Sequence, residues 1–173
     1  MQFPSNFIRG LIKKSVSFGT ILASADATVQ LIETHRKLQS KFNWKSLERH
    51  GLVGSCVIGP VLYCYYFALD KKWPGTSIRT VATKLACDIM FANIAYYCLF
   101  YYCISFLQHK NHKRAKKDTK DVLVKTYVVG CLYWTPLMAL NFKYLSPQSR
   151  VLFVAMATYI EMNGLCLMSR EKN

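Results

Sequence analysis

TKLACDIMFANIAYYCLFYYCISFLQ, residues 83–108, is the stretch that decides the fold. From Leu85 to Leu107 it is almost continuously apolar and aromatic, which is typical of a helix that crosses a lipid bilayer. The stretch nevertheless opens with Lys84 and carries Asp88 inside it. Ionisable side chains within a span cost at least about 2.5 kcal/mol each, and they usually face a bundle interior or a water-filled cavity. The stretch therefore predicts a membrane helix with polar contacts on one side.

Further apolar segments lie on both sides of this stretch, at residues 15–33, 51–69, 122–142 and 151–168. No alternation of the kind found in strands appears, so we expect an all-α fold. The whole chain, 1–173, is predicted to be one polytopic membrane helix bundle with four to five spans. The first and fourth segments are the doubtful spans, and the distribution of Lys and Arg does not determine the orientation.

The charge of the chain is strongly unbalanced, with 23 Lys+Arg against 9 Asp+Glu. Such a balance favours either nucleic acid or an anionic membrane surface as a partner. The most basic run, residues 108–121, lies between two apolar segments and has no aromatic side chain to stack on a base. We therefore predict a solvated loop against the anionic headgroups of a lipid bilayer, and no nucleic acid partner.

The first residues, 1–14, contain Arg9 and Lys13 but no acid. An apolar face with basic residues beside it is typical of an organellar targeting segment, and it equally suits a basic flank to the first span.

Nothing in the sequence indicates catalysis or a bound cofactor. The 7 cysteines all lie in apolar runs, and none forms a CxxC pair, so neither a disulfide framework nor a zinc site is expected. No phosphate-binding, dinucleotide-binding, metalloprotease or serine-hydrolase motif occurs. We expect no enzyme activity, no cofactor and no metal.

The second apolar segment has small residues at intervals of four, Gly51, Ser55 and Gly59. This spacing lets membrane helices approach closely. Pro60 follows directly and is predicted to kink the helix.

Polar side chains inside the apolar segments are the candidate lining of a passage: Asp26, Gln30, Lys84 and Asp88. Lys84 and Asp88 are four residues apart and could instead satisfy each other as a structural pair. A third interpretation is that the helix begins later, which would leave both groups among the lipid headgroups. Lys125 and Glu161 interrupt the last two apolar segments in the same way.

A series of residues along nearly the whole chain resembles the Mpv/PMP family of small peroxisomal and inner mitochondrial membrane proteins. The matching positions are Gly19, Asp26, Gln30, Gly59, Pro60, Lys84, Asp88, Trp134, Asn141, Phe142 and Arg150. The block from Trp134 to Arg150 is the most specific. Where the family has characteristic residues, this chain has Ile89, Ile94 and Glu161, so it resembles a diverged member.

The resemblance implies a four-span protein of the inner mitochondrial or peroxisomal membrane, with no enzyme activity. Some members of the family form weakly selective pores for small solutes. We therefore expect passage of small hydrophilic solutes through a bundle or a homo-oligomer. The alternative is a structural or assembly protein without a pore.

The acid-free start favours the mitochondrial inner membrane, and the peroxisomal membrane is the alternative.

Overall fold

The computed structural model describes residues 5–36 and 41–168, and within them every regular element is a helix. In chain order these are α1 (Ser5–His35), α2 (Trp44–Val53), η1 (Gly54–Ile58), α3 (Gly59–Lys72), α4 (Ile78–Cys87), η2 (Asp88–Ala92), α5 (Asn93–His109), α6 (His112–Tyr144) and α7 (Pro147–Met168). The prediction of an all-α bundle is confirmed.

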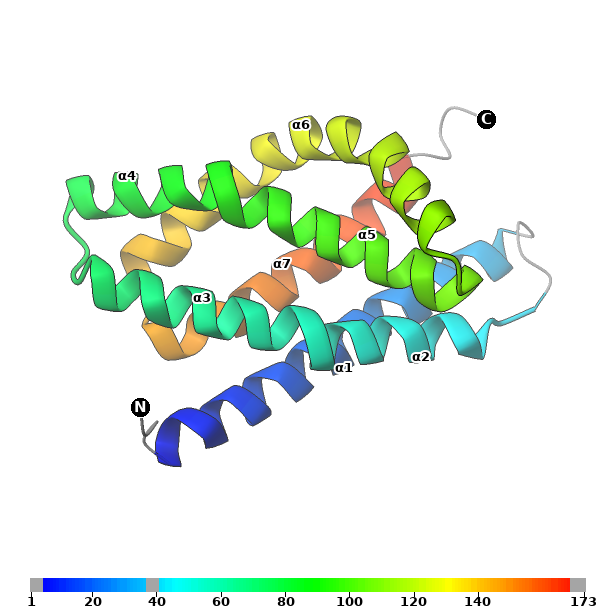
Figure 1. The fold of residues 1–173 in the computed structure, drawn as a ribbon, viewed down its shortest axis with the longest axis horizontal. Coiled ribbons are helices and arrows are strands. Elements are labelled where there is room, and N and C mark those ends of the chain that lie inside the picture. Colours follow the sequence, from blue (N-terminus) through cyan, green and yellow to red (C-terminus); the bar gives the residue numbers. More distant parts are fainter. Residues whose placement is uncertain (1–4, 37–40, 169–173) are drawn as a thin grey trace.

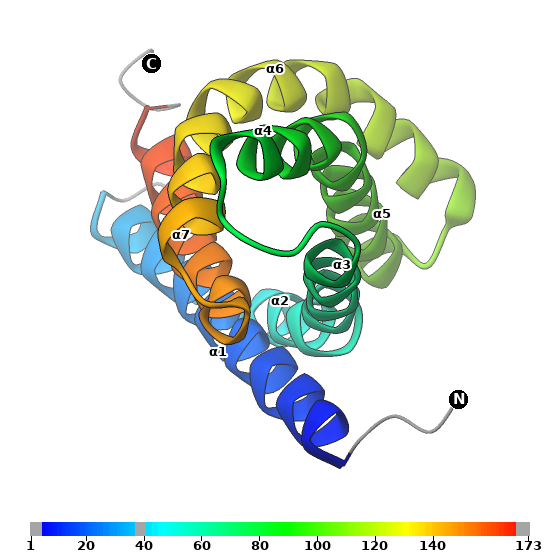
Figure 2. The same cartoon turned by 90° about the vertical axis from the view of Figure 1, so that its left-hand side faces the viewer.

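The helices run alternately up and down the long axis of the molecule (Figure 1). Short connections cause this arrangement. Consecutive helices are joined by residues 73–77, 110–111 and 145–146. Connections of this length make each helix pack antiparallel to the one before it. Viewed along the bundle, α3, α4, α5, α6 and α7 surround the axis, while α1 crosses the outside of α2 and α7 (Figure 2).

Apolar side chains from these helices fill the centre of the bundle. The buried core includes Phe18, Leu22, Ile58, Leu62, Tyr66, Tyr96, Trp134, Met138, Phe142 and Val154.

The second and third long helices each change pitch without breaking. Residues 44–72 pass through the π-helical segment η1, and residues 78–109 pass through η2. Pro60 lies two residues after the end of η1, in the first turn of α3. Proline has no N–H to donate and its ring crowds the preceding turn, so a local widening of the helix is a physical response to it. The sequence predicts a kink at Pro60, and the structure has a π-helical segment immediately before α3.

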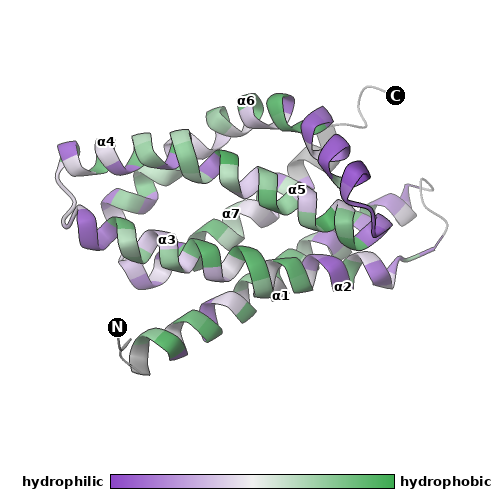
Figure 3. Ribbon diagram, in the orientation of Figure 1, coloured by the Kyte–Doolittle hydropathy of each residue, from purple (hydrophilic) through white to green (hydrophobic). Residues whose placement is uncertain are grey.

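Four helical stretches of the described chain are long and apolar enough to cross a membrane: Phe7–His35, Trp44–Lys72, Ile78–His109 and His112–Tyr144. They include the first and fourth segments, which the sequence alone left doubtful. Hydropathy mapped on the ribbon shows the apolar residues along the helix lengths and a polar first part of α6 (Figure 3).

Helix α1 crosses the helix of residues 44–72 at very short range, as the small residues predict. A Cβ atom added to Gly59 would lie 2.7 Å from the Cα of Ser15, and one added to Gly54 would lie 2.7 Å from the Cα of Gly19. Gly51 has more space, because its added Cβ would meet Ala23 Cβ at 3.6 Å. The crossing therefore depends on Gly19, Gly54 and Gly59 more than on Gly51.

The prediction of a loop over residues 108–121 is wrong for most of its length. Asn111 accepts hydrogen bonds from the backbone N–H groups of Lys113 and Arg114, and the chain is helical from His112 onward. Asp118 accepts a hydrogen bond from Ser105 of α5 at 2.5 Å, which holds this part of α6 against the bundle. The helix-favouring Lys and Ala of the run, together with this capping, explain the difference.

Candidate functional site

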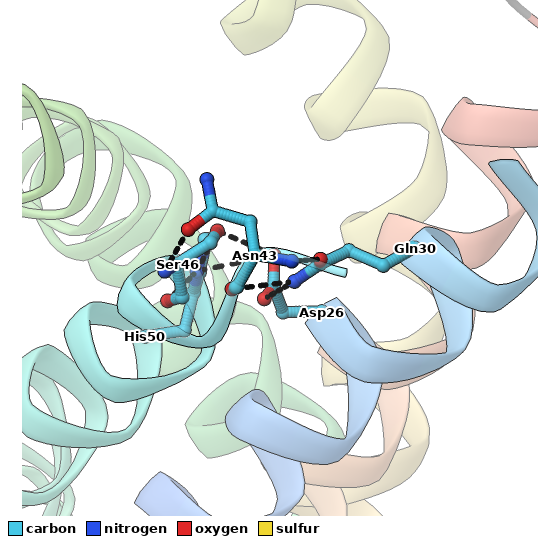
Figure 4. Close-up of polar contacts among 5 residues, drawn as sticks. All are labelled: Asp26, Gln30, Asn43, Ser46 and His50. Carbon is cyan, nitrogen blue, oxygen red and sulfur yellow. Dashed lines mark hydrogen bonds and ion pairs between the residues drawn. The ribbon is translucent and has the colours of Figure 1, made fainter. Parts of the chain in front are cut away.

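Two polar residues of α1 meet the start of α2 in a cluster, here named the α1–α2 cluster, which consists of Asp26, Gln30, Asn43, Ser46 and His50 (Figure 4). Gln30 donates to Asp26 Oδ2 at 2.7 Å and accepts the backbone N–H of Asn43 at 2.6 Å. The Ser46 hydroxyl donates to Asp26 Oδ1 at 3.0 Å, and His50 Nδ1 lies 3.3 Å from the same oxygen. Asp26 and Gln30 therefore fix one end of the bundle, and neither lines the cavities described below.

The opposite end of the bundle holds a buried charge cluster of Asp70, Lys84 and Arg150, here named the Asp70 centre. Lys84 Nζ donates to Asp70 Oδ1 at 2.7 Å, and the Arg150 guanidinium donates to the same oxygen. The ammonium group also donates to the carbonyl of Gly75 at 3.3 Å. Lys84 is 1% exposed and Arg150 is 2% exposed. The centre thus joins the last turn of α3 to α4 and to the first turn of α7.

The Asp70 centre carries more positive than negative charge, since two cations share one carboxylate. Arg150 offsets part of its desolvation by donating to the carbonyl of Leu145 at 3.3 Å and by lying 5.3 Å from the centroid of the Phe142 ring. Asp70 Oδ2 is buried, and no described residue hydrogen-bonds to it. Removing this carboxylate would leave both cations buried without a counter-charge.

Asp70 is not among the predicted site residues, because it directly follows the apolar run 51–69 and does not interrupt an apolar segment. The spacing of Asp70 and Lys84 in the sequence could have indicated their contact. Asp70 and Lys84 are 14 residues apart on either side of a short turn with Gly75, whose φ is 93°. Two antiparallel helices joined there place those side chains opposite each other.

Asp88 lies one helical turn from Lys84 but does not pair with it, so the predicted pair is wrong. The Lys84 ammonium is held by Asp70 and Gly75 instead. Asp88 is 6% exposed, and its Oδ1 has no hydrogen-bond partner in the described chain. Both residues lie inside the helix that begins at Ile78 and are buried, so the interpretation in which the helix begins after them is wrong.

Asp88 faces a small cavity in the middle of the bundle. The cavity has a volume of about 20 Å³, enough for one water molecule. Its walls come from α3, η2, α5, α6 and α7 and consist of Leu62, Tyr66, Asp88, Ala92, Asn93, Tyr96, Trp134, Met138 and Val154. Of the four predicted polar residues, Asp88 is thus the one that this cavity exposes.

Trp134 belongs to a third polar group, farther along the bundle. Its Nε1 donates to Tyr97 Oη at 3.1 Å and to Glu161 Oε1 at 3.2 Å, and the Tyr97 hydroxyl donates to the same Glu161 oxygen at 2.8 Å. Glu161, one of the positions at which the chain departs from the family pattern, is therefore partnered.

The neighbouring motif residues Asn141 and Phe142 are fully buried. Asn141 donates to the sulfur of Met138 at 3.5 Å, and its Oδ1 has no partner in the described chain. Phe142 packs edge-on against Tyr66 and lies under Arg150. Together these residues anchor α6 against α3 and α7.

The described chain contains no group of three or more His, Cys, Asp or Glu side chains that could hold a metal ion. Its cysteines have free thiols, and Cys166 lies outside the described side chains.

Comparison with known proteins identifies relatives of this chain. Residues 105–160 match the model of the Mpv17 / PMP22 family. The chain is 30% identical over 141 residues to "PXMP2/4 family protein 4" of Dictyostelium discoideum, covering 82% of this chain and 76% of that protein. It is 25% identical over 149 residues to "Mpv17-like protein" of Xenopus laevis, covering 86% and 71%. It is 23% identical over 146 residues to "Peroxisomal membrane protein 2" of Bos taurus, covering 83% and 74%. No solved structure matches the chain.

Proposed function

The chain belongs to the Mpv17/PMP22 family of membrane proteins, and from this premise we propose that it is a weakly selective passage for small hydrophilic solutes in an organelle membrane. The observation that carries the proposal is Asp88, a buried carboxylate that lines a cavity and has one oxygen without a hydrogen-bond partner in the described chain. A carboxylate that only set the packing of helices would be expected to have a protein partner.

The charge of Asp88 gives the passage a preference for cations over anions. In its present shape the cavity admits one water molecule, so larger solutes require the bundle to widen. The α1–α2 cluster and the Asp70 centre hold the two ends, whereas α3 packs against α1 and α7 and only sparsely against α4 and α5. We expect the widening at this boundary.

A structural or assembly protein without a pore is the second candidate. It is favoured by the α1–α2 cluster and the Asp70 centre, where Asp26, Gln30, Lys84 and Arg150 hydrogen-bond to other parts of the bundle. In that case the cavity beside Asp88 would hold a single structural water, and the protein would conduct nothing.

For the location we propose the mitochondrial inner membrane, with the peroxisomal membrane as the alternative. The acid-free basic start supports the first. The name of the similar bovine protein, "Peroxisomal membrane protein 2", supports the second. Protease protection of a tagged chain in isolated mitochondria and peroxisomes distinguishes the two.

Solute release from proteoliposomes tests the proposed passage. Vesicles carrying the purified protein are loaded with a mixture of small polyols, sugars and a large dextran. We expect the smallest solutes to leave, and the dextran to be retained as in protein-free vesicles. Complete retention by correctly folded protein would favour the structural alternative. Chemical cross-linking in the same vesicles tests the proposed homo-oligomer.

A further inference from the structure

A second cavity opens to the outside of the bundle between α3 and α5. It has a volume of about 160 Å³ and is lined by Ile58, Val61, Leu62, Tyr65, Phe91, Ala92, Ala95, Tyr96 and Leu99. Apart from its two tyrosines, every lining residue is apolar. Phe91 is 65% exposed and Val61 is 45% exposed, so the rim of this groove faces the surroundings of the bundle.

The groove lies directly beside the cavity that holds Asp88. Leu62, Ala92 and Tyr96 line both spaces, so the groove adjoins the cavity that Asp88 lines. The Tyr96 hydroxyl contacts Thr158 of α7 at 3.5 Å, so its polar end is already engaged there. The Tyr65 hydroxyl, by contrast, is buried with no partner in the described chain. Unpartnered polar atoms therefore occur at both spaces.

The helix geometry is irregular on both sides of the groove. Segment η1 ends at Ile58 in one wall, and η2 contributes Phe91 and Ala92 to the other. Single π turns inside α-helices are frequent at functional sites. The Tyr127 hydroxyl donates to the carbonyl of Ile89 within η2 at 3.1 Å, which stabilises the irregular turn from the side away from the groove.

We propose that the groove and the cavity together bind a single-chain amphiphile with a primary ammonium head. The alkyl chain lies in the groove, and the ammonium group donates to Asp88. A carboxylate with an oxygen that has no partner in the described chain selects a cationic donor, because Lys84, one helical turn away, is held by Asp70. The volume of about 20 Å³ admits a head the size of a water molecule, which an ammonium group is and a trimethylammonium group is not.

This site goes beyond solute passage and does not require it. The amphiphile enters sideways from the lipid, whether or not the bundle conducts. A bound head would nevertheless occupy the cavity that faces Asp88, and so would compete with any solute there.

Photolabelling of the full chain in phosphatidylcholine nanodiscs tests the proposal. The probe is dodecylamine with a diazirine in its chain, and the matched probes are the dodecyltrimethylammonium and dodecanol compounds with the same diazirine. We expect saturable labelling of groove residues by the amine. Loss of a charge-assisted hydrogen bond should weaken binding of the other two probes about tenfold or more.

Three variants locate the site. Asp88→Asn should weaken amine binding about tenfold, because the charge of the acceptor is removed while its shape is kept. Ala92→Trp should abolish binding, because the larger side chain fills the space where the groove adjoins the cavity. Glu161→Gln is the matched control, since it removes a carboxylate that Tyr97 and Trp134 hold outside the groove and keeps an acceptor oxygen. It should bind the amine as the unaltered chain does.

Several results would overturn the proposal: labelling that does not saturate, equal affinity for the trimethylammonium probe, or equal affinity in Asp88→Asn. If Asp88→Asn does not fold, the comparison of probes on the unaltered chain and the Ala92→Trp variant still decides. Failure of the proposed passage is distinguishable, because vesicles that release no solute can still bind the amine.

Discussion

A single oxygen atom, Oδ1 of Asp70, accepts from a lysine and an arginine on two other helices. Lys84 and Arg150 are both fully inside the bundle, where an uncompensated charge is far more costly than at a surface. The stability of the Asp70 centre therefore depends on the number of buried cations for each carboxylate. The centre holds one cation in excess, and this makes the effects of substitutions at its members unequal.

Asp70→Asn should destabilise the protein by about 3–5 kcal/mol, because it leaves two buried cations without a counter-charge. Lys84→Met should cost clearly less, since it leaves the neutral pair of Asp70 and Arg150 in place. Reversible unfolding in mixed micelles, followed by circular dichroism, gives both free energies. Equal losses for the two variants would show that the charge balance of the centre does not control its stability.

At the scale of elements, the crossing of α1 over the helix of residues 44–72 depends on close backbone contact. The atoms nearest to the positions of the missing Cβ atoms at Gly54 and Gly59 are backbone atoms of α1. Backbone cannot move aside as the end of a flexible side chain can, so an added methyl group must push the helices apart.

Gly59→Ala should therefore destabilise the protein by about 1–3 kcal/mol, the usual cost of overpacking. Its Cβ would lie 2.7 Å from Ser15 Cα. Gly51→Ala is the matched control, because its Cβ would meet Ala23 at an ordinary 3.6 Å and alanine also favours the helix. Thermal melting of both variants in detergent checks this. A stable Gly59→Ala variant would mean that the two helices do not pack in the manner described.

The basic first part of α6 is the second element with a testable role, which we propose to be contact with anionic lipid. Ala115 and Thr119 are buried against the bundle, whereas Lys113, Lys116, Lys117 and Lys120 are exposed. Helical geometry thus presents one charged face, which a solvated loop would not. Each such residue near an anionic membrane contributes about 1 kcal/mol, and salt weakens the effect.

Replacing those four lysines by serine should remove any preference for anionic lipid around the protein. Quenching of tryptophan fluorescence by brominated phosphatidylserine, compared with brominated phosphatidylcholine, measures that preference. We expect the unaltered chain to favour phosphatidylserine at low salt and to lose the preference at high salt. An equal preference in the serine variant would contradict this role.

At the scale of the whole molecule, the sequence predicts the helices well and their polar contacts poorly. Apolar length located the apolar segments, because a bilayer requires about twenty apolar residues from each helix, but it left the first and fourth segments in doubt as spans. The small residues likewise predicted the close crossing near Gly59. The pairing of Lys84 with Asp88 failed for a different reason: spacing along one helix says nothing about a competing carboxylate on another, and Asp70 lies on α3.

The roles of the candidate site residues likewise could not be predicted from their positions along one helix. Asp26, Gln30 and Asp88 all interrupt apolar segments, and nothing in that local pattern separates them. Only the packing of α1 against α2 shows that Asp26 and Gln30 are partnered, while Asp88 keeps an oxygen without a partner in the described chain and faces a cavity. The distinction depends on contacts between elements, and therefore it could not be read from a single sequence.

The reversal potential of the purified protein in a planar bilayer, under a potassium chloride gradient, tests most directly the claim that solutes pass Asp88. We predict a current with a modest preference for cations in the unaltered chain. In Asp88→Asn the reversal potential should move toward that of an unselective pore, because the carboxylate charge at the cavity is gone. Glu161→Gln, whose carboxylate is held by Tyr97 and Trp134, should leave it unchanged. A silent bilayer with correctly folded protein, or the same reversal potential in Asp88→Asn as in the unaltered chain, would contradict the account.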